Sequence, residues 1–263
     1  MDLVPRSLPF AAAIHYLRRK LRIPAPTWLT VLRAENDWAF QVAGATKAQL
    51  LEDLHVAVTR AIEEGTTLHQ FRKDFDQVVQ DAGWSYKGSR GWRTRTIFQT
   101  NLRTAHAAGR YRQMTSDVVR RRRPYWRYRH GGSLEPRKHH VSSPPNGWNG
   151  LVLPADDPWW DTHYPPNGWG CSCFAQTLSE ADLDRLGLAV DEAPDFGTYE
   201  WANPETGEVE QIPVGVGPEW AYAPGASSEA QRAQLFERMK SRMRPELQRL
   251  VETQARLKER TSG

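Results

Sequence analysis

Residues 163–173 of this chain are HYPPNGWGCSC, and this stretch decides how the middle of the protein is built. Asn167 and Gly168 both tolerate positive φ, so the stretch is predicted to form a tight turn that presents two cysteines. In an extended Cys-x-Cys segment the two thiols point to the same side, so Cys171 and Cys173 can both reach one ion. The stretch therefore predicts a turn-rich module with a thiol pair at its centre.

Several histidines could join this cysteine pair. The sequence places four of them near it: His130, His139, His140 and His163. Thiolate sulfur and imidazole nitrogen are the usual ligands of structural zinc, which takes four of them in a tetrahedron. We predict a zinc ion that holds the loop-rich module together, with the ligands Cys171, Cys173, His163 and His140. The alternative is two buried free thiols with surface histidines, because Cys-x-Cys is a weaker signal than paired Cys-x-x-Cys motifs.

The segment around this stretch, residues 124–225, is rich in Pro, Gly, Asn and Trp and shows few helical stripes. This composition predicts short strands joined by turns, with a hairpin over residues 200–212. A short helix is expected over residues 179–186, where a serine can act as the N-cap. The pentapeptide PPNGW occurs at 144–148 and again at 165–169, and we interpret the two copies as similar turns.

Residues 1–123 carry apolar residues at helical spacing instead. One apolar stripe lies between residues 50 and 62 and another between 71 and 79, and a glycine follows each. A longer helix is expected from about residue 90 to 119. Small residues such as Ala105, Ala108 and Gly109 occur on it where a core stripe is expected, and small residues let another helix approach closely.

The last segment, residues 226–263, is charged and helical in pattern, and Pro245 interrupts it. A narrow apolar seam on this tail is expected to dock on the same chain or on a partner helix. Taken together, the sequence predicts an α+β protein in three parts. These are a helical N-terminal region (1–123), a loop-rich Cys/His module with short strands (124–225) and a charged helical tail (226–263).

The charge pattern suggests a nucleic-acid contact. The chain has 35 Lys and Arg against 31 Asp and Glu, a modest net charge of +4, but arginines cluster beside aromatic residues after residue 119. Arginine forks bind phosphates and aromatic faces stack on bases, which predicts sequence-independent binding. The predicted contact residues are Arg120, Arg121, Arg122, Arg123, Trp126, Arg127 and Arg129. The alternative is a solvated helix end, because cations are favourable at a helix C-terminus.

No sequence feature makes a strong case for catalysis, and no catalytic residue is predicted. The chain lacks the Gly-x-Ser-x-Gly, phosphate-loop and His-Glu-x-x-His motifs. Asp161 and His163 lie close together and could support metal-assisted hydrolysis, so a metal-dependent nuclease or toxin-like effector is the alternative hypothesis. A free-standing nucleic-acid-binding regulator is a third.

Membrane and secretion signals are not expected from this sequence. No segment approaches the ~20 consecutive apolar residues that a membrane helix requires. The first ten residues lack the apolar core of a signal peptide. We therefore expect a protein made and kept in a cytoplasm, where a structural disulfide is not favoured.

Three stretches carry a resemblance to a known family. They are residues 154–173 (PADDPWWDTHYPPNGWGCSC), 217–225 (GPEWAYAPG) and 100–110 (TNLRTAHAAGR). The chain resembles the phage Mu F-like minor head proteins, which belong to the phage head morphogenesis family. In that family a His-Tyr-Pro-Pro-Asn-Gly-Trp turn precedes Asn-Cys-Arg-Cys, and here Gly170 and Ser172 replace the Asn and the Arg. The resemblance extends over most of residues 9–225.

This resemblance implies a minor capsid protein that acts in procapsid assembly and DNA packaging near the portal. The expected partners are the portal protein, the major capsid protein and packaged DNA, which would be bound without sequence preference. The expected location is the virion, after assembly in the host bacterial cytoplasm. The resemblance implies no turnover chemistry, so the chain is predicted not to be an enzyme.

Overall fold

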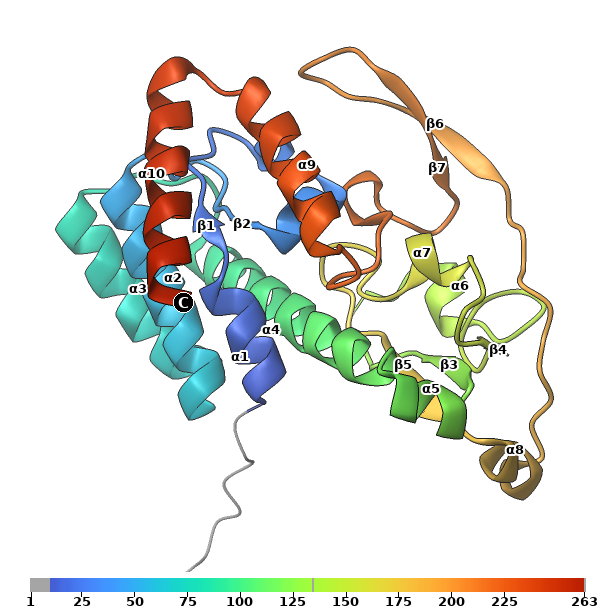
Figure 1. The fold of residues 1–263 in the computed structure, drawn as a ribbon. Coiled ribbons are helices and arrows are strands. Elements are labelled where there is room, and N and C mark those ends of the chain that lie inside the picture. The colour runs from blue at the N-terminus through green and yellow to red at the C-terminus, as the bar shows by residue number, and fades with distance from the viewer. Residues whose placement is uncertain (1–9, 134, 263) are drawn as a thin grey trace, which may run out of the picture. The chain divides into compact units, whose positions relative to one another are not determined.

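A computed structural model describes residues 10–133 and 135–262 of the chain (Figure 1). Helices dominate and the strands form small sheets, which confirms the predicted α+β class. The described residues fall into two compact units. The first unit combines residues 10–31 and 35–109 with the tail from 227 onward, and the second comprises residues 32–34 and 110–226.

Four helices build the main core of the first unit: α1 (Ala11–Arg18), α2 (Ala48–Glu64), α3 (Leu68–Ala82) and the part of α4 (Arg90–Met114) up to residue 109. The predicted stripes of α2 and α3 are buried there, with Leu54, Val58 and Phe75 fully enclosed. Glycines in the left-handed conformation end both helices, as the sequence predicts. Apolar burial of this kind stabilises the bundle by about 25 cal/mol per Å².

The small residues of α4 allow the close approach that the sequence predicts. Ala105 and Ala108 are buried, and a Cβ added at Gly109 would lie 2.8 Å from the backbone nitrogen of Ala13. The ring of Phe10, at the start of α1, would lie 2.9 Å from the same Cβ. The N-terminus of α1 therefore packs directly on the backbone of α4.

The tail folds as two helices, α9 (Glu229–Ser241) and α10 (Pro245–Ser262), divided before Pro245 as predicted. They pack on a two-stranded parallel sheet, β1 (Leu21–Arg22) with β2 (Ala39–Phe40). Two 3-10 helices, η1 (Trp28–Thr30) and η2 (Arg33–Asp37), lie between these strands in the sequence, and Arg242 donates a hydrogen bond to Glu35 of η2. Met239 and Val251 supply the buried seam. The side-chain amide of Gln254 accepts a hydrogen bond from Arg22 N at 2.9 Å and donates one to Arg22 O at 3.1 Å. The apolar seam of the tail thus docks on its own chain.

The second unit is organised around a three-stranded antiparallel sheet in the order β4 (Val152–Pro154), β3 (Tyr125–Arg129), β5 (Phe174–Leu178). Short helices flank the strands: α5 (Asp117–Arg122) precedes β3, α6 (Lys138–Val141) follows it, α7 (Trp160–His163) follows β4, and α8 (Glu180–Leu186) follows β5. A capping box between Ser179 and Asp182 starts α8 where the sequence predicts it. The expected hairpin forms from β6 (Thr198–Ala202) and β7 (Val209–Pro213), and the 3-10 helix η3 (Pro218–Trp220) follows.

Alternation along β3 separates two environments. Trp126 and Tyr128 point into an aromatic core, where Trp126 packs edge-on against Trp160 at 5.4 Å between ring centroids. The neighbouring side chains of Arg127 and Arg129 share the opposite, half-buried face.

Both copies of the PPNGW turn contain a cis peptide bond between their prolines. Within the described ranges, every helix falls short of the length or apolar character that crossing a membrane requires.

Candidate metal centre

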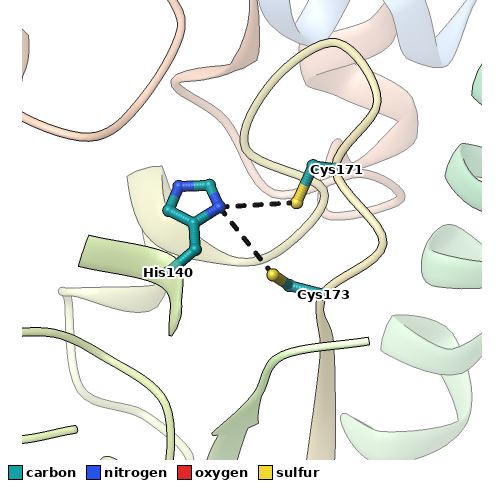
Figure 2. A group of neighbouring side chains, drawn as sticks. All are labelled: His140, Cys171 and Cys173. Carbon is teal, nitrogen blue, oxygen red and sulfur yellow. Dashed lines mark hydrogen bonds between the residues drawn. The ribbon is translucent and has the colours of Figure 1, made fainter. Parts of the chain in front are cut away.

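Two elements of the second unit bring a histidine and two cysteines together. Cys171 and Cys173 lie on the extended segment between the PPNGW turn and β5, and His140 lies on α6. The Nδ1 atom of His140 lies 3.7 Å from the Sγ of Cys171 and 3.8 Å from the Sγ of Cys173, and Figure 2 shows the ring directed at both sulfurs. All three residues are buried, and their ligand atoms lie within 4.8 Å of one another. The structure thus assembles three of the four predicted ligands.

These spacings match those of a metal site. With Zn–S bonds of about 2.3 Å and Zn–N bonds of about 2.0 Å, a tetrahedron has S···N edges of about 3.6 Å. The two observed S···N distances, 3.7 and 3.8 Å, are close to that edge length. One zinc ion could therefore bind all three atoms with little rearrangement.

The orientation of His140 also suits a ligand. Its Nε2 lies 2.8 Å from the carbonyl oxygen of Gly215, which can only accept a hydrogen bond, so Nε2 carries the proton. Nδ1 then keeps its lone pair and directs it at the two sulfurs. The ring is held in place by Trp148, which stacks on it at 4.9 Å and 29°. A carbonyl partner of this kind is what usually fixes the tautomer of a metal-bound histidine.

The two neighbouring thiols shift each other's pKa in opposite directions. A hydrogen bond from Cys173, with a further contribution from His140, holds the pKa of the Cys171 thiol well below its ordinary value despite burial. The pKa of Cys173 is correspondingly raised, by its hydrogen bond to Cys171 and by burial. A metal ion that binds both sulfurs must displace the remaining thiol protons.

The fourth predicted ligand, His163, lies elsewhere in this core. Its ring stacks on Trp159 at 4.3 Å and 10°, and its Nδ1 lies 3.1 Å from the carbonyl oxygen of Trp159 and 2.9 Å from the hydroxyl of Thr162. Burial lowers its pKa to about 4. It does not join the group formed by His140, Cys171 and Cys173. Another histidine, His130, places its Nδ1 3.7 Å from the Sγ of Cys173, although its position in the sequence offers no reason to prefer it as a ligand.

Five of the seven predicted nucleic-acid residues fall into three groups, and the other two, Arg127 and Arg129, lie on the half-buried face of β3. Arg120, Arg121 and Arg122 lie on the last turn of α5, and all three are exposed. Arg123 is engaged within the unit, because its guanidinium donates to Thr177 at 2.9 Å and to Asp182 at 2.7 Å. Trp126 is only 1% exposed and so cannot stack on a base in this structure.

An aromatic residue that the sequence prediction missed lies on the arginine face of the sheet. Phe174 pairs in register with Arg129 and is 47% exposed. Since register partners share a face, Phe174 lies beside Arg129 and on the same side as Arg127. The alternation of side chains along β5 could have indicated that Phe174 lies on this face, once the pairing of β5 with β3 was known.

The comparisons with known proteins agree with the sequence resemblance. A family model described as "Phage Mu protein F like protein" matches residues 52–176, a range that includes His140 and both cysteines. Protein F of Escherichia phage Mu, whose name gives capsid assembly as its proposed role, is 32% identical over 256 residues, covering 84% of this chain and 55% of the relative. The Mu-like prophage FluMu F protein of Haemophilus influenzae is 35% identical over 173 residues, covering 62% of this chain and 40% of the relative.

The chain spans about half the length of the curated relatives it matches. No solved structure matches it significantly. Both relatives are F proteins, one from phage Mu and one from a Mu-like prophage, and the family model matches the segment that holds the candidate metal ligands. Residues 52–176 of the chain are thus similar to the Phage Mu protein F like family.

Proposed function

We propose that this chain is a minor head protein of a Mu-like tailed phage or prophage, and that it acts in procapsid assembly and DNA packaging near the portal. The observation that carries this proposal is the 32% identity over 256 residues to phage Mu protein F, which is named for capsid assembly. The proposed role is that of the part of protein F to which this chain is similar. The protein works by binding and not by catalysis.

The metal centre supports a structural part in this role. His140, Cys171 and Cys173 are 2%, 4% and 7% exposed, so a zinc ion bound to them would have little access to water or substrate. Closed sites with sulfur and nitrogen ligands are typical of structural zinc. The ion would fasten α6 to the segment that leads into β5. A module made largely of short elements gains most from such a cross-link.

Contact with DNA is the second part of the proposal. Arg120, Arg121 and Arg122 at the end of α5 present their charge to solvent, and Arg127 and Arg129 lie on the sheet face with Phe174. No acidic partner within ion-pair distance is found for these five arginines among the described residues. Unpaired guanidinium groups suit the phosphate backbone, which predicts salt-dependent binding without sequence preference.

The partners and location follow from the same role. We propose the portal protein and the major capsid protein as partners, with the protein retained in the virion after assembly in the host cytoplasm. Trp92, on the first turn of α4, is 58% exposed and is a candidate for such a contact. Tryptophan is enriched among the residues that contribute most to protein interfaces.

Deleting the gene from an inducible lysogen, and restoring it from a plasmid, tests the proposal. Mass spectrometry of purified particles should detect the protein. Electron microscopy of the deletion strain should show empty or aberrant heads, and the plasmid should restore normal ones. Infectious particles of normal form in the absence of the protein would refute the assembly role.

The nuclease hypothesis has no support from either relative. The ring of His163, which that hypothesis requires, is stacked on Trp159, and its Nδ1 is occupied by the Trp159 carbonyl and Thr162. Incubating purified protein with DNA and RNA, with and without a chelator, distinguishes a head protein from a metal-dependent nuclease. Repeated strand cleavage that the chelator abolishes would favour the nuclease.

A further inference from the structure

We infer that His130 supplies the fourth ligand of the metal centre, and that the bound ion closes the end of the β3–β5 pair. This inference rests on the proposed zinc site of His140, Cys171 and Cys173. It concerns which residue completes that site and what the completed site does to the sheet. The chemistry expected is a zinc ion with two thiolates and two imidazoles.

The strand register places His130 next to Cys173. Arg129, the last residue of β3, pairs with Phe174, the first residue of β5. The next residues outward on the two antiparallel strands are His130 and Cys173, so they meet at the open end of the pair. Because side chains alternate along a strand, both face away from Arg129 and toward the side of Tyr128, where His140 lies at 6.1 Å between ring centroids.

The loop after β3 is fixed against the cysteine segment. A Cβ added at Gly131 would overlap the carbonyl oxygen of Ser172, so only glycine allows the two backbones to approach this closely. The hydroxyl of Ser133 accepts a hydrogen bond from Ser172 N at 3.2 Å and lies 2.8 Å from the hydroxyl of Ser172. These contacts hold Ser172, the residue between the two cysteines, in place.

A separate contact fixes His130 itself. Its backbone nitrogen donates to the side-chain oxygen of Asn149 at 3.1 Å. With Gly131 packed on Ser172 on one side and Asn149 bound on the other, the backbone of His130 is anchored beside Cys173. What remains to be determined is where the imidazole ring of His130 points.

The distance from His130 to Cys173 is that of two ligands on one ion. The Nδ1 atom of His130 lies 3.7 Å from the Sγ of Cys173, close to the S···N edge of about 3.6 Å in a tetrahedral zinc site. Cys173 therefore has an imidazole nitrogen at ligand spacing from two directions, since His140 lies 3.8 Å from the same sulfur. His163 has no such contact with either sulfur among the described interactions.

Binding requires a movement that His130 can make. Its ring nitrogens lie outside the group of ligand atoms that are all within 4.8 Å of one another, so the ring must turn toward Cys171. The side chain is half-buried and belongs to a segment without regular structure, so its ring is not enclosed on every side and can change rotamer. The ring of His163 is stacked on Trp159 and packs edge-on against Trp148, so it has no comparable freedom.

A fourth ligand at this position gives the ion a mechanical role. The ion would connect the end of β3, the cysteine segment before β5, and α6. Arg129 and Phe174 lie immediately beyond the connection, on the opposite face. Metal binding would thereby fix the part of the sheet that carries the proposed nucleic-acid face.

Cobalt(II) titration of the metal-free full-length protein tests this inference, because the visible absorption of cobalt reports both coordination number and bound thiolate. The wild type should show the intense bands of a four-coordinate site together with thiolate charge transfer. His130→Ala should keep the charge transfer, lose the four-coordinate intensity and bind at least about tenfold more weakly. His130→Cys should restore four-coordination with stronger charge transfer. The control His163→Phe, which keeps a ring stacked on Trp159, should match the wild type.

The outcomes separate this inference from the proposed zinc site. If His130→Ala binds cobalt with the wild-type spectrum and affinity, His130 is not a ligand although the site stands. If His163→Phe loses four-coordination, the fourth ligand is His163 and the inference is overturned. If the wild type shows no thiolate charge transfer at any cobalt concentration, the zinc site itself is wrong.

Discussion

The Nε2 atom of His140 lies 2.8 Å from the carbonyl oxygen of Gly215, 75 residues further along the chain. This contact decides which ring nitrogen of His140 is available to bind a metal ion. With Nε2 protonated and bound to the carbonyl, Nδ1 has only the two thiols of Cys171 and Cys173 before it. A long-range backbone contact therefore prepares a metal ligand.

Removal of the metal should lower stability strongly. Cys171→Ser should abolish stoichiometric zinc binding, because it replaces a thiolate with a poor zinc ligand. A ligand present at a thousandfold its Kd stabilises the folded state by about 4 kcal/mol. At roughly 2–4 °C per kcal/mol for a chain of this size, Tm should fall by about 10 °C. Metal analysis of protein purified without a histidine tag, together with calorimetry, measures both effects.

Ser172→Ala is the matched control for this experiment, since it lies between the cysteines and has no predicted ligand role. It should retain zinc, and chelator should lower its Tm as it does that of the wild type. Zinc well below one equivalent in the wild type, with an unchanged melting curve for Cys171→Ser, would contradict the structural zinc site.

Replacing the exposed arginines should weaken DNA binding in a salt-dependent way. Each phosphate contact contributes about 0.9 to the slope of log K against log salt. Replacing Arg120, Arg121 and Arg122 with Ser should therefore reduce the slope by up to about 2.7. Fluorescence anisotropy with duplexes of unrelated sequence, over a range of salt concentrations, measures it.

A control with the same change in net charge is available on the tail. Arg238, Arg244 and Arg249 are exposed on or between α9 and α10, and replacing them with Ser should leave the slope close to that of the wild type. An equal reduction in both triple variants would show that net charge, and not the end of α5, governs binding.

Gly109→Ala should destabilise the first unit although alanine is the better helix former. The added Cβ would lie 2.8 Å from the backbone nitrogen of Ala13, and backbone atoms cannot move aside cheaply. Overpacking of this kind costs typically 1–3 kcal/mol, which exceeds the gain of about 1 kcal/mol in helix propensity. Urea denaturation should show the loss. Gly91→Ala, on the same helix with no atom within 4 Å of the new Cβ, should be neutral or stabilising.

Lys20 should make the free energy of unfolding depend on pH in the alkaline range. Burial lowers its pKa to about 8, against about 10.4 in an unfolded chain. Between these values the unfolded state binds more protons, so this group's contribution to stability increases as pH rises from about 8 to 10.4. Lys20→Met removes the contribution, and the difference in unfolding free energy should shift in favour of the wild type over that range. Urea titrations of both proteins at pH 7.5, 8.5 and 9.5 provide the comparison.

Local patterns predicted most of the helices, because periodicity and caps are properties of neighbouring residues. The stripes of α2 and α3, the start of α8 and the break before Pro245 all appear where the sequence places them. The predicted long helix is interrupted after Met114, and its last residues form α5 instead. The assignment of the tail to the same compact unit as α1 required contacts more than 200 residues apart.

The sequence predicts the candidate site only where the spacing of residues along the chain restricts how their side chains can be arranged. The Cys-x-Cys spacing is enough to place two thiols together, and His140 joins them as expected. The choice of His163 rested on closeness in sequence, but α7 directs its ring onto Trp159. Trp126 stood among arginines in the sequence, but alternation along β3 buried it and left Phe174 exposed on the other strand. Which face a side chain takes depends on strand pairing, which sequence proximity does not reveal.

The amide of Gln254, bound to both backbone groups of Arg22, has a consequence for synthesis on the ribosome. The strand that Gln254 completes is translated 232 residues before Gln254 itself. The second unit, encoded between them, can close while translation is still under way, since domains generally fold as they emerge. The first unit must wait with part of its apolar surface uncovered until α9 and α10 have left the ribosome.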